Sequence, residues 1–418
     1  MTSPSSSGAD DLAALYRDLH QHPELSFAEV RTAAIVAGRL RDIGFETTEK
    51  VGRTGVVGVL RNGPGATVLL RADMDALPMV ERTGLSYASV ASGIDAAGNE
   101  VPVAHSCGHD VHVACLLGAA QRLAEERSSW RGTVLAVFQP AEELGRGAQA
   151  MIDDGLYERF GRPDVVLGQH VAPFPSGFLA VRPGPFFAAA DALRVNLYGT
   201  GGHGSRPETT VDPVVMAAAT VLRLQTIVSR ETAGTDAAVV TVGALRAGTK
   251  ENIIPDEAEL LISIRSFDPQ VRQRTLAAIE RIVRAEANAS AARRDPRIEL
   301  FDSFPALVND LAALARTRPA LEALVGPDRI FDPGLVTASE DVGLLASAAD
   351  APCVFWLLGG SDPAQFAGAS NAEQIAARVA QLPSNHSPLF APVIEPTLTT
   401  GVSALVAAAQ VWLESPSG

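Results

Sequence analysis

Continuous apolar segments of strand length, separated by segments with helical periodicity, recur at both ends of this 418-residue chain. They include two strands separated by an Asn-Gly-Pro-Gly turn within residues 55–74, and the segments 133–140, 164–171 and 352–360, while residues 110–126 have the spacing of a helix. A strand that is apolar on both sides must be covered on both of its faces. The pattern therefore predicts an α/β fold whose central mixed sheet is covered by helices.

The middle of the chain has a different pattern. "ALRVNLYG" alternates apolar and polar residues as a half-exposed strand does, and Asp212-Pro213 is a typical N-cap and first position of a helix. We expect a smaller α+β domain here, inserted into the first domain. The predicted boundaries are a disordered tail at 1–10, a catalytic domain at 11–186 and 303–418, and the inserted domain at 187–302.

One helix start is marked by its own residues. Ser26 and Glu29 in "SFAE" have the spacing of a capping box, in which each side chain bonds to the backbone N–H of the other. This motif predicts a helix that begins there and ends near Gly44.

The composition limits the partners and the compartment. The formal net charge is −14, whereas a nucleic-acid or anionic-membrane surface would require a basic face. The three cysteines are an odd number and lie far apart, so we expect no disulfide framework and a reducing, cytoplasmic setting. The sequence has no signal-peptide pattern and no apolar run as long as a membrane span, so we also expect no membrane partner.

Metal-binding residue types gather in "AHSCGHDVHVA", which holds three of the eight histidines and one of the three cysteines. Cys107 and His109 are two residues apart and can point the same way, and a thiolate with an imidazole suits zinc. A buried cysteine beside a helix-capping histidine is an open alternative. We expect His105 and His112 to support the ligands or to pack, rather than to bind metal.

Other candidates follow apolar segments elsewhere in the chain. Glu142 and Glu143 come directly after one such segment, where α/β proteins build their sites. One glutamate could bind metal while the other moves a proton. His170 ends another apolar segment, and His386 lies in a loop between prolines. Taken singly, each has an equally good structural explanation. The two glutamates could lie in a solvated loop, His170 could be a core histidine, and His386 could be a turn residue.

Two further groups are candidates. Asp73 ends a strand and could bind metal, orient a ligand, or simply pair with Arg71. In the inserted block, His203 lies among glycines, and Asn252 and Arg265 are suitable groups for recognising a carboxylate or an oxyanion. A plain turn at His203 and a surface charge at Arg265 are the structural alternatives.

Together the motifs resemble a known family. "HQHPELSFAE", "LRADMDALPM", "HSCGHDVHVA", "FQPAEELGRGA", "GGHGSRPETTVDP", "NIIPDEAEL", "SED" and "NHSP" occur in its order. The chain resembles the zinc-dependent aminoacylase and carboxypeptidase family over nearly its whole length. It is most similar to the amidohydrolase branch with hippurate hydrolases and indole-acetyl-amino-acid hydrolases.

The resemblance implies a catalytic domain with two divalent metal ions per subunit and a lid domain through which the protein forms a homodimer. Cys107 would bridge the two ions, with His109 and His170 on one and Glu143 and His386 on the other. Zinc is the expected metal, and manganese, cobalt and nickel remain open. Many family members have a metal-binding histidine at the position of Arg71, which this chain lacks.

The resemblance also implies the chemistry. Glu142 would be the general base and acid, His203 would polarise the scissile carbonyl, and Asn252 and Arg265 would hold the substrate's carboxylate. The expected reaction is the hydrolysis of small N-acyl amino acids to a carboxylic acid and a free amino acid. A dipeptidase or carboxypeptidase on the same fold is one alternative, and a non-catalytic metal- or ligand-binding relative is another. A third is an enzyme in which Cys107 is a covalent nucleophile, with His105 or His109 as its base.

Overall fold

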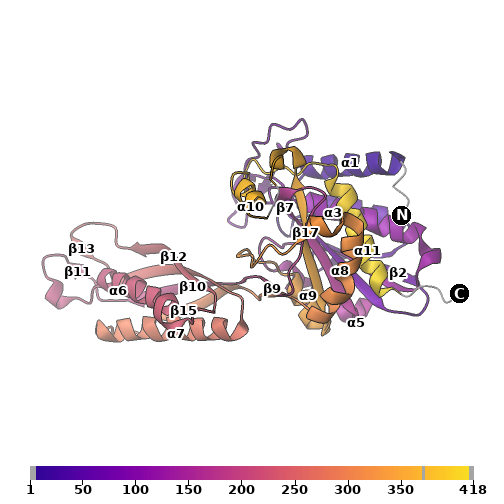
Figure 1. Ribbon diagram of the computed structural model, residues 1–418. Helices are drawn as coiled ribbons and strands as arrows, with labels where there is room; N and C mark the ends of the chain where they lie inside the picture. The colour runs from indigo at the N-terminus through magenta and orange to yellow at the C-terminus, as the bar shows by residue number, and fades with distance from the viewer. Residues whose placement is uncertain (1–5, 370–371, 414–418) are drawn as a thin grey trace. The chain divides into compact units, whose positions relative to one another are not determined.

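The computed structural model describes residues 6–369 and 372–413 (Figure 1). The chain forms two compact units. Unit 1 comprises the described residues of Met1–Gly184, Val308–Gly334 and Asp341–Gly418, and unit 2 comprises Pro185–Leu307 and Leu335–Glu340. In the described ranges, no helix has both the length and the apolar character that crossing a membrane would require.

Two details differ from the expected boundaries. The segment Leu335–Glu340 belongs to unit 2, because the N–H of Val336 donates to the carbonyl of Phe186 at 2.8 Å. Helix α1 (Ser6–Gln21) begins within the stretch expected to be a tail, and the Asp11–Arg39 ion pair at 2.6 Å attaches its first half to the next helix. The rest of that predicted tail, residues 1–5, lies outside the described residues.

Unit 1 is built on a mixed sheet of eight strands. In spatial order they are β1 (Glu46–Val51), β2 (Gly55–Asn62), β6 (Gly132–Gln139), β3 (Thr67–Asp73), β7 (Val165–Pro175), β18 (Cys353–Ser361), β8 (Leu179–Ala180) and β17 (Ile330–Phe331). The central strands β6, β3, β7 and β18 are parallel, and antiparallel pairs flank them. The carboxyl ends of the four central strands therefore meet at one edge of the sheet.

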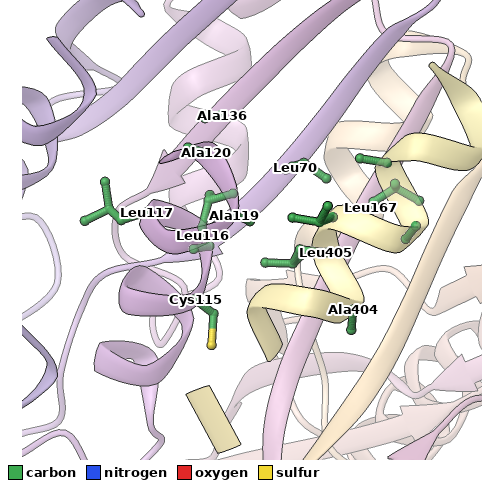
Figure 2. Packing of buried hydrophobic residues seen from close by; sticks show 14 of the residues in the cluster. Leu70, Cys115, Leu116, Leu117, Ala119, Ala120, Ala136, Leu167, Ala404 and Leu405 are labelled. Atoms are coloured by element: carbon green, nitrogen blue, oxygen red, sulfur yellow. The ribbon is translucent and has the colours of Figure 1, made fainter. Parts of the chain in front are cut away.

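Helices cover both faces of this sheet, as predicted. One face carries α1, α2 (Val30–Asp42), α3 (His109–Glu125), α8 (Leu311–Val325) and α11 (Thr397–Trp412), and the other carries α4 (Gly147–Asp153), α5 (Leu156–Phe160) and α9 (Val342–Ala349). In the core on the first face, Leu116 of α3 and Leu405 of α11 lie near Leu70 and Leu167 of the sheet (Figure 2). A helix α10 (Ala372–Val379) and a hairpin of β4 (Ser92–Ile94) and β5 (Glu100–Pro102) complete the unit.

The predicted capping box at the start of α2 is not formed. Ser26 instead donates to Asp75 Oδ2 at 2.6 Å, and Glu29 accepts a bond from the distant N–H of Ala141 at 2.8 Å. Glu24 caps the helix, because its carboxylate accepts two N–H bonds of the first turn at 2.9 and 2.8 Å. Tertiary partners have replaced the local ones that the motif offered.

Unit 2 contains a four-stranded antiparallel sheet with helices on one face. The strand order is β12 (Ala238–Ala247), β14 (Glu257–Ser266), β10 (Ala189–Tyr198) and β15 (Arg297–Phe304), and the helices are α6 (Pro213–Thr226) and α7 (Pro269–Ala289). Asp212 caps α6 as predicted, accepting the N–H of Val214 at 2.8 Å. Short strands β9 (Gly184–Phe187), β11 (Gly202–His203), β13 (Ile253–Ile254) and β16 (Leu307–Asn309) form two small ladders.

Candidate metal centre and active site

The candidate site of unit 1 lies at the carboxyl ends of the parallel strands. Asp73 is the last residue of β3, and Glu142–Glu143 follow the end of β6. Arg71 pairs with Gly168 of β7, so His170, two residues further along β7, lies level with Asp73. This register is the reason why side chains far apart in sequence reach the same edge.

The turn before α3 brings Cys107 and His109 together. Gly108 between them has φ +85°, a left-handed conformation that favours glycine. A Cβ atom at this position would also lie 2.3 Å from Cγ1 of Val171. The glycine therefore permits both the tight turn and its close approach to β7.

Five of the predicted metal ligands form two overlapping groups. The ligand atoms of Cys107, His109 and His170 all lie within 4.8 Å of one another, and so do those of Cys107, Glu143 and His386. Sγ of Cys107 is 3.4 Å from Nε2 of His170, and Nε2 of His386 is 3.3 Å from Oε2 of Glu143. The sulfur is the atom that the two groups share.

The polar atoms of this cluster fit a divalent cation. In the described parts of the chain, Nε2 of His109 and Oε1 of Glu143 are buried without a hydrogen-bond partner, whereas Nδ1 of His109 is 3.3 Å from Oδ1 of Asp75. Burial lowers the pKa of His109. The nearby carboxylates of Asp73 and Asp75 have a larger effect in the opposite direction and raise this pKa to about 10. A buried site that favours positive charge and offers unpaired ligand atoms is suited to a metal ion.

The two neighbouring histidines have different roles. His170 donates from Nδ1 to the carbonyl of Val171 at 2.8 Å, which leaves Nε2 free to bind metal. His112 has no free nitrogen, because Nε2 accepts the N–H of Val171 at 2.8 Å and Nδ1 is 2.5 Å from Oδ1 of Asp73. Burial lowers the pKa of His112 despite Asp73, so the ring is neutral and its proton lies on Nδ1.

Asp73 lies behind the cluster in a buried network. Its Oδ2 is 2.6 Å from Nη1 of Arg71, and Arg71 also bonds to Asp341 at 3.0 Å and to Gln139 at 2.9 Å. Burial opposes ionisation, but Arg71 and the nearby histidines hold the pKa of Asp73 well below its usual range. With its oxygens facing Arg71 and His112, Asp73 orients its neighbours. Asp341 was not predicted, because nothing in "SED" marks a partner 270 residues away.

The loop that carries His386 is attached to the other ligand segments. His386 has φ +67°, and its N–H donates to the carbonyl of Ser106 at 2.8 Å. The amide of Asn385 donates to the carbonyls of Cys107 and Val171, at 3.1 Å each. Asn385 thus connects three segments of the site, a role that sequence reasoning missed. The only sequence signal was its place beside His386.

Asp75 fixes the backbone of both glutamates. Its carboxylate accepts the N–H of Glu142 at 3.1 Å and that of Glu143 at 3.0 Å. Oε2 of the buried Glu142 is 3.9 Å from Nε2 of His109, so Glu142 borders the cluster. Sequence analysis gave Asp75 no role, although its two-residue spacing from Asp73 is that of two carboxylates on the same side of an extended chain.

Unit 2 places its three predicted residues at two different sites. His203 pairs with Ile253, and the N–H of Gly204 donates to the carbonyl of Asn252 at 2.9 Å, so His203 and Asn252 lie close together. Arg265 is near the far end of β14, where Nη1 is 2.5 Å from Oγ of Ser339. About eight residues of strand separate the two sites, roughly 27 Å. One chain therefore does not bring Asn252 and Arg265 together.

Comparison with known proteins decides the family. The model of "Peptidase family M20/M25/M40" matches residues 69–383. The chain belongs to this family. It is 40% identical over 330 residues to hippurate hydrolase of Campylobacter jejuni, covering 78% of this chain and 82% of that protein. It is 39% identical over 306 residues to thermostable carboxypeptidase 1 of Saccharolobus solfataricus, covering 72% and 75%.

A solved structure agrees with this assignment. The chain is similar to a Bacillus subtilis protein described as a dinuclear metal binding peptidase, with a TM-score of 0.78, 28% identity and coverage of 98% of this chain and 100% of that one. This M20/M25/M40 member is thus a metal-dependent amidohydrolase, as its motifs predicted. The family match includes every residue of the cluster except His386, which lies three residues beyond its end.

The geometry of this family member argues against a cysteine nucleophile. Burial and the nearby carboxylates of Glu143 and Glu142 raise the pKa of Cys107 well above its usual value, whereas a nucleophilic cysteine needs a lowered pKa. His105 is not hydrogen-bonded to Cys107, because neither of its ring nitrogens has a partner among the described residues. Burial also lowers the pKa of His105 to about 4. A cation could supply the charge that turns this thiol into a thiolate.

Proposed function

We propose that this amidohydrolase removes the acyl group from N-acyl amino acids and uses two divalent metal ions to do so. The observation that carries the proposal is the sulfur of Cys107, shared by the two ligand groups. His109 and His170 would hold one ion with it, and Glu143 and His386 would hold the other. Zinc suits this set of thiolate, imidazole and carboxylate ligands, and manganese, cobalt and nickel are the alternatives.

Glu142 would carry the proton. When bound, the divalent ions would lower the pKa of water and polarise the amide carbonyl. Glu142 is buried beside the cluster, with Oε2 3.9 Å from Nε2 of His109, so its carboxylate would accept the proton of the attacking water. The same carboxylate then delivers this proton to the leaving amine, which departs as the free amino acid.

Unit 2 would recognise the substrate. His203 would donate to the carbonyl oxygen as charge develops on it, and Asn252 and Arg265 would bind the substrate's carboxylate. Asn252 precedes the start of β14 and Arg265 lies near its end, so both can reach one substrate only if two copies of the chain contribute. This separation supports a homodimer in which each site uses residues of both subunits.

The outer edge of unit 2 offers a surface for this dimer. Strand β12 is an edge strand with exposed Val239 and Leu245, and helix α6 exposes Val215 and Leu222. An exposed edge strand flanked by apolar side chains is a typical pairing surface. We place the dimer contact on this surface, whose apolar side chains a second copy would bury.

The three cysteines support a reducing, cytoplasmic compartment. All three are buried, and none forms a disulfide. Oxidation of Cys107 would remove the shared ligand, so the proposed site requires reducing conditions.

Peptide hydrolysis is the second candidate function. The 39% identity to a thermostable carboxypeptidase favours it, because the same groups would cleave an amide bond between two amino acids. The two functions differ only in what occupies the acyl side of the scissile bond.

The test is hydrolysis of a panel of N-benzoyl and N-acetyl amino acids and dipeptides. Hydrolysis is measured as the release of free amino acid. The protein is assayed as isolated, after chelation and dialysis, and after addition of zinc, manganese, cobalt or nickel. We expect activity that chelation removes and metal restores, with N-acyl amino acids turned over faster than dipeptides. Faster dipeptide hydrolysis would select the second function. Activity that survives complete metal removal would overturn the metal-dependent mechanism.

A further inference from the structure

The turn between β6 and α4 has an unfavourable backbone conformation just before Glu142. Ala141 has φ +47°, a left-handed conformation that is unfavourable for a non-glycine residue. The turn is also tight, because a Cβ atom on Gly147 would lie 1.5 Å from the carbonyl oxygen of Pro140. Such a conformation persists only where surrounding contacts enforce it.

Three consecutive N–H groups of this turn point at two buried carboxylates. The N–H groups of Glu142 and Glu143 bond to Asp75, as described above. The N–H of Ala141, the strained residue itself, donates to Oε1 of Glu29 at 2.8 Å. Glu29 comes from the start of α2, 112 residues earlier in the chain.

Glu29 has few other interactions that would explain its burial. Its side chain is fully buried, and its second oxygen is 2.5 Å from the hydroxyl of Thr54. A buried carboxylate costs stability unless hydrogen bonds compensate, and the proximity of Asp75 increases that cost. Glu24 already caps α2, so the helix does not require Glu29 for its orphan N–H groups. The bond to Ala141 is the contact that links Glu29 to the site.

We propose that Glu29 is a positioning residue: its bond to the N–H of Ala141 holds the turn in its strained form and so aims the carboxylate of Glu142. The inference rests on the proposed role of Glu142 as proton carrier. Glu29 acts through the backbone and does not touch substrate, metal or reacting atoms. Its loss should therefore lower kcat while KM and metal content stay near their wild-type values.

The first test compares Glu29→Ala with the matched control Glu24→Ala. Both variants remove a carboxylate that bonds near the start of α2, but only Glu29 contacts the turn before Glu142. We expect kcat to fall about 10- to 100-fold in Glu29→Ala. In Glu24→Ala we expect a lower Tm with kcat within about twofold of wild type. A similar drop of kcat in both variants would overturn the proposal.

A conservative variant separates positioning from folding. Burial and Asp75 raise the pKa of Glu29 to about 7, so a neutral amide is a close replacement that keeps an acceptor for the N–H of Ala141. We expect Glu29→Gln to recover most of the lost kcat. In Glu29→Asp the side chain is one methylene shorter, so its carboxylate no longer reaches the N–H of Ala141, and the variant should behave like Glu29→Ala. If Glu29→Ala does not fold, Glu29→Asp takes its place in the comparison. Equal activity of Glu29→Gln and Glu29→Asp would contradict the proposal.

The decisive comparison removes the strain itself. Glycine accepts a positive φ without cost, so Ala141→Gly should make the turn less dependent on Glu29. We expect removal of Glu29 to lower kcat by a smaller factor in the Ala141→Gly background, about threefold. If removal of Glu29 lowers kcat by the same factor in the wild-type and the Ala141→Gly backgrounds, the proposal is overturned. It is also overturned if the decrease in kcat is explained by a loss of bound metal.

Glu142→Gln, measured in parallel, separates the two proposals. Retained activity there would overturn the role of Glu142 and, with it, the reason for positioning. Lost activity there with normal kcat in Glu29→Ala would overturn the Glu29 proposal alone.

Discussion

Sγ of Cys107 lies 3.4 Å from Nε2 of His170, although 63 residues separate them in the chain. The contact exists because the turn before α3 packs against β7, where only the glycine at position 108 leaves enough room. The same sulfur belongs to the group formed with Glu143 and His386. One side chain thus connects two sets of candidate ligand atoms.

The first prediction concerns the shared sulfur. Cys107→Ser should reduce the bound metal from two ions per chain to fewer than one, because both groups lose a ligand, and activity should fall more than about 100-fold. Metal content is measured by mass spectrometry after dialysis. Cys115→Ser is the matched control, since Cys115 is equally buried but contacts Leu398 in the core and should keep both ions. Two ions in Cys107→Ser would contradict the shared-ligand geometry.

A second prediction separates His112 from its neighbour. Both nitrogens of His112 are engaged by Asp73 and Val171, so His112→Ala should weaken metal binding by about 10- to 100-fold and still allow full loading at high metal concentration. His170→Ala, which removes a free Nε2, should lose an ion that excess metal does not restore. Titration against a chelating dye measures both affinities. If the two variants lose metal to the same extent, His112 is itself a ligand.

A third prediction concerns the buried Arg71 network. Arg71→Met leaves Asp73 and Asp341 without their cation, which should lower the free energy of unfolding by about 3–5 kcal/mol. Arg61→Met, in β2, removes an ion pair to Glu46 whose side chains are 53% and 74% exposed, and we expect a loss of less than about 1 kcal/mol. Urea unfolding measures both. Equal stability losses would show that burial does not determine the cost.

The fourth prediction is a pH dependence of stability that comes from His20. Its Nδ1 is 2.6 Å from Oδ2 of Asp110 and its Nε2 is 3.1 Å from Oε1 of Glu81, in a pocket that Tyr16 and Tyr87 border. Burial opposes the charge, but the two carboxylates raise the pKa of His20 to about 10 from an ordinary value of 6.5. The folded state therefore binds the proton more tightly than the unfolded state does.

The sign of this effect follows from the raised pKa. The contribution of His20 to stability is complete below pH 6.5 and is lost as the pH rises to about 10. The unfolding free energy of wild type, measured relative to that of His20→Gln, should therefore shrink between pH 6.5 and 10. A difference that stays constant or grows over this range would show that the imidazole is neutral in the folded protein.

Features with a local signal were predictable from the sequence. The apolar runs that became β3, β6 and β7 identify a covered sheet, because few other structures bury both sides of a strand. Residue type and position marked Cys107 and His170 as separate candidates, and the family resemblance implied that they share one ion; the structure brings the two side chains to 3.4 Å. Asp212 capped its helix as expected, because the partner of a cap lies two or three residues away.

Features that depend on long-range pairing were not predictable. The capping box of Ser26 and Glu29 was a sound local motif, but Asp75 and the N–H of Ala141 compete for the same side chains from 49 and 112 residues away. Asn385 bonds to two carbonyls of distant segments, and an asparagine in a loop has no signal for that. Hydrogen bonds of this kind depend on the finished packing, which neither periodicity nor composition specifies.

The separation of Asn252 and Arg265 shows the same limit at a larger scale. Both residue types suit a carboxylate, and 13 positions in a chain allow either proximity or separation. The extended strand β14 lies between them, because Asn252 precedes its start and Arg265 is near its end, and only the strand's bounds reveal this. Asn252 and Arg265 can each bind a carboxylate, but this does not establish that one subunit uses both of them on the same substrate.

The most direct test of this account is the turnover of Glu142→Gln together with its metal content. Glu142 is the proposed proton carrier, and it lies beside the proposed metal ligands, with Oε2 3.9 Å from Nε2 of His109. We predict two ions per chain, a KM within a few-fold of wild type, and a kcat lower by about 10²- to 10⁴-fold. A variant that keeps both ions and most of its turnover would show that another group moves the proton. One that loses its ions would show that Glu142 is a ligand.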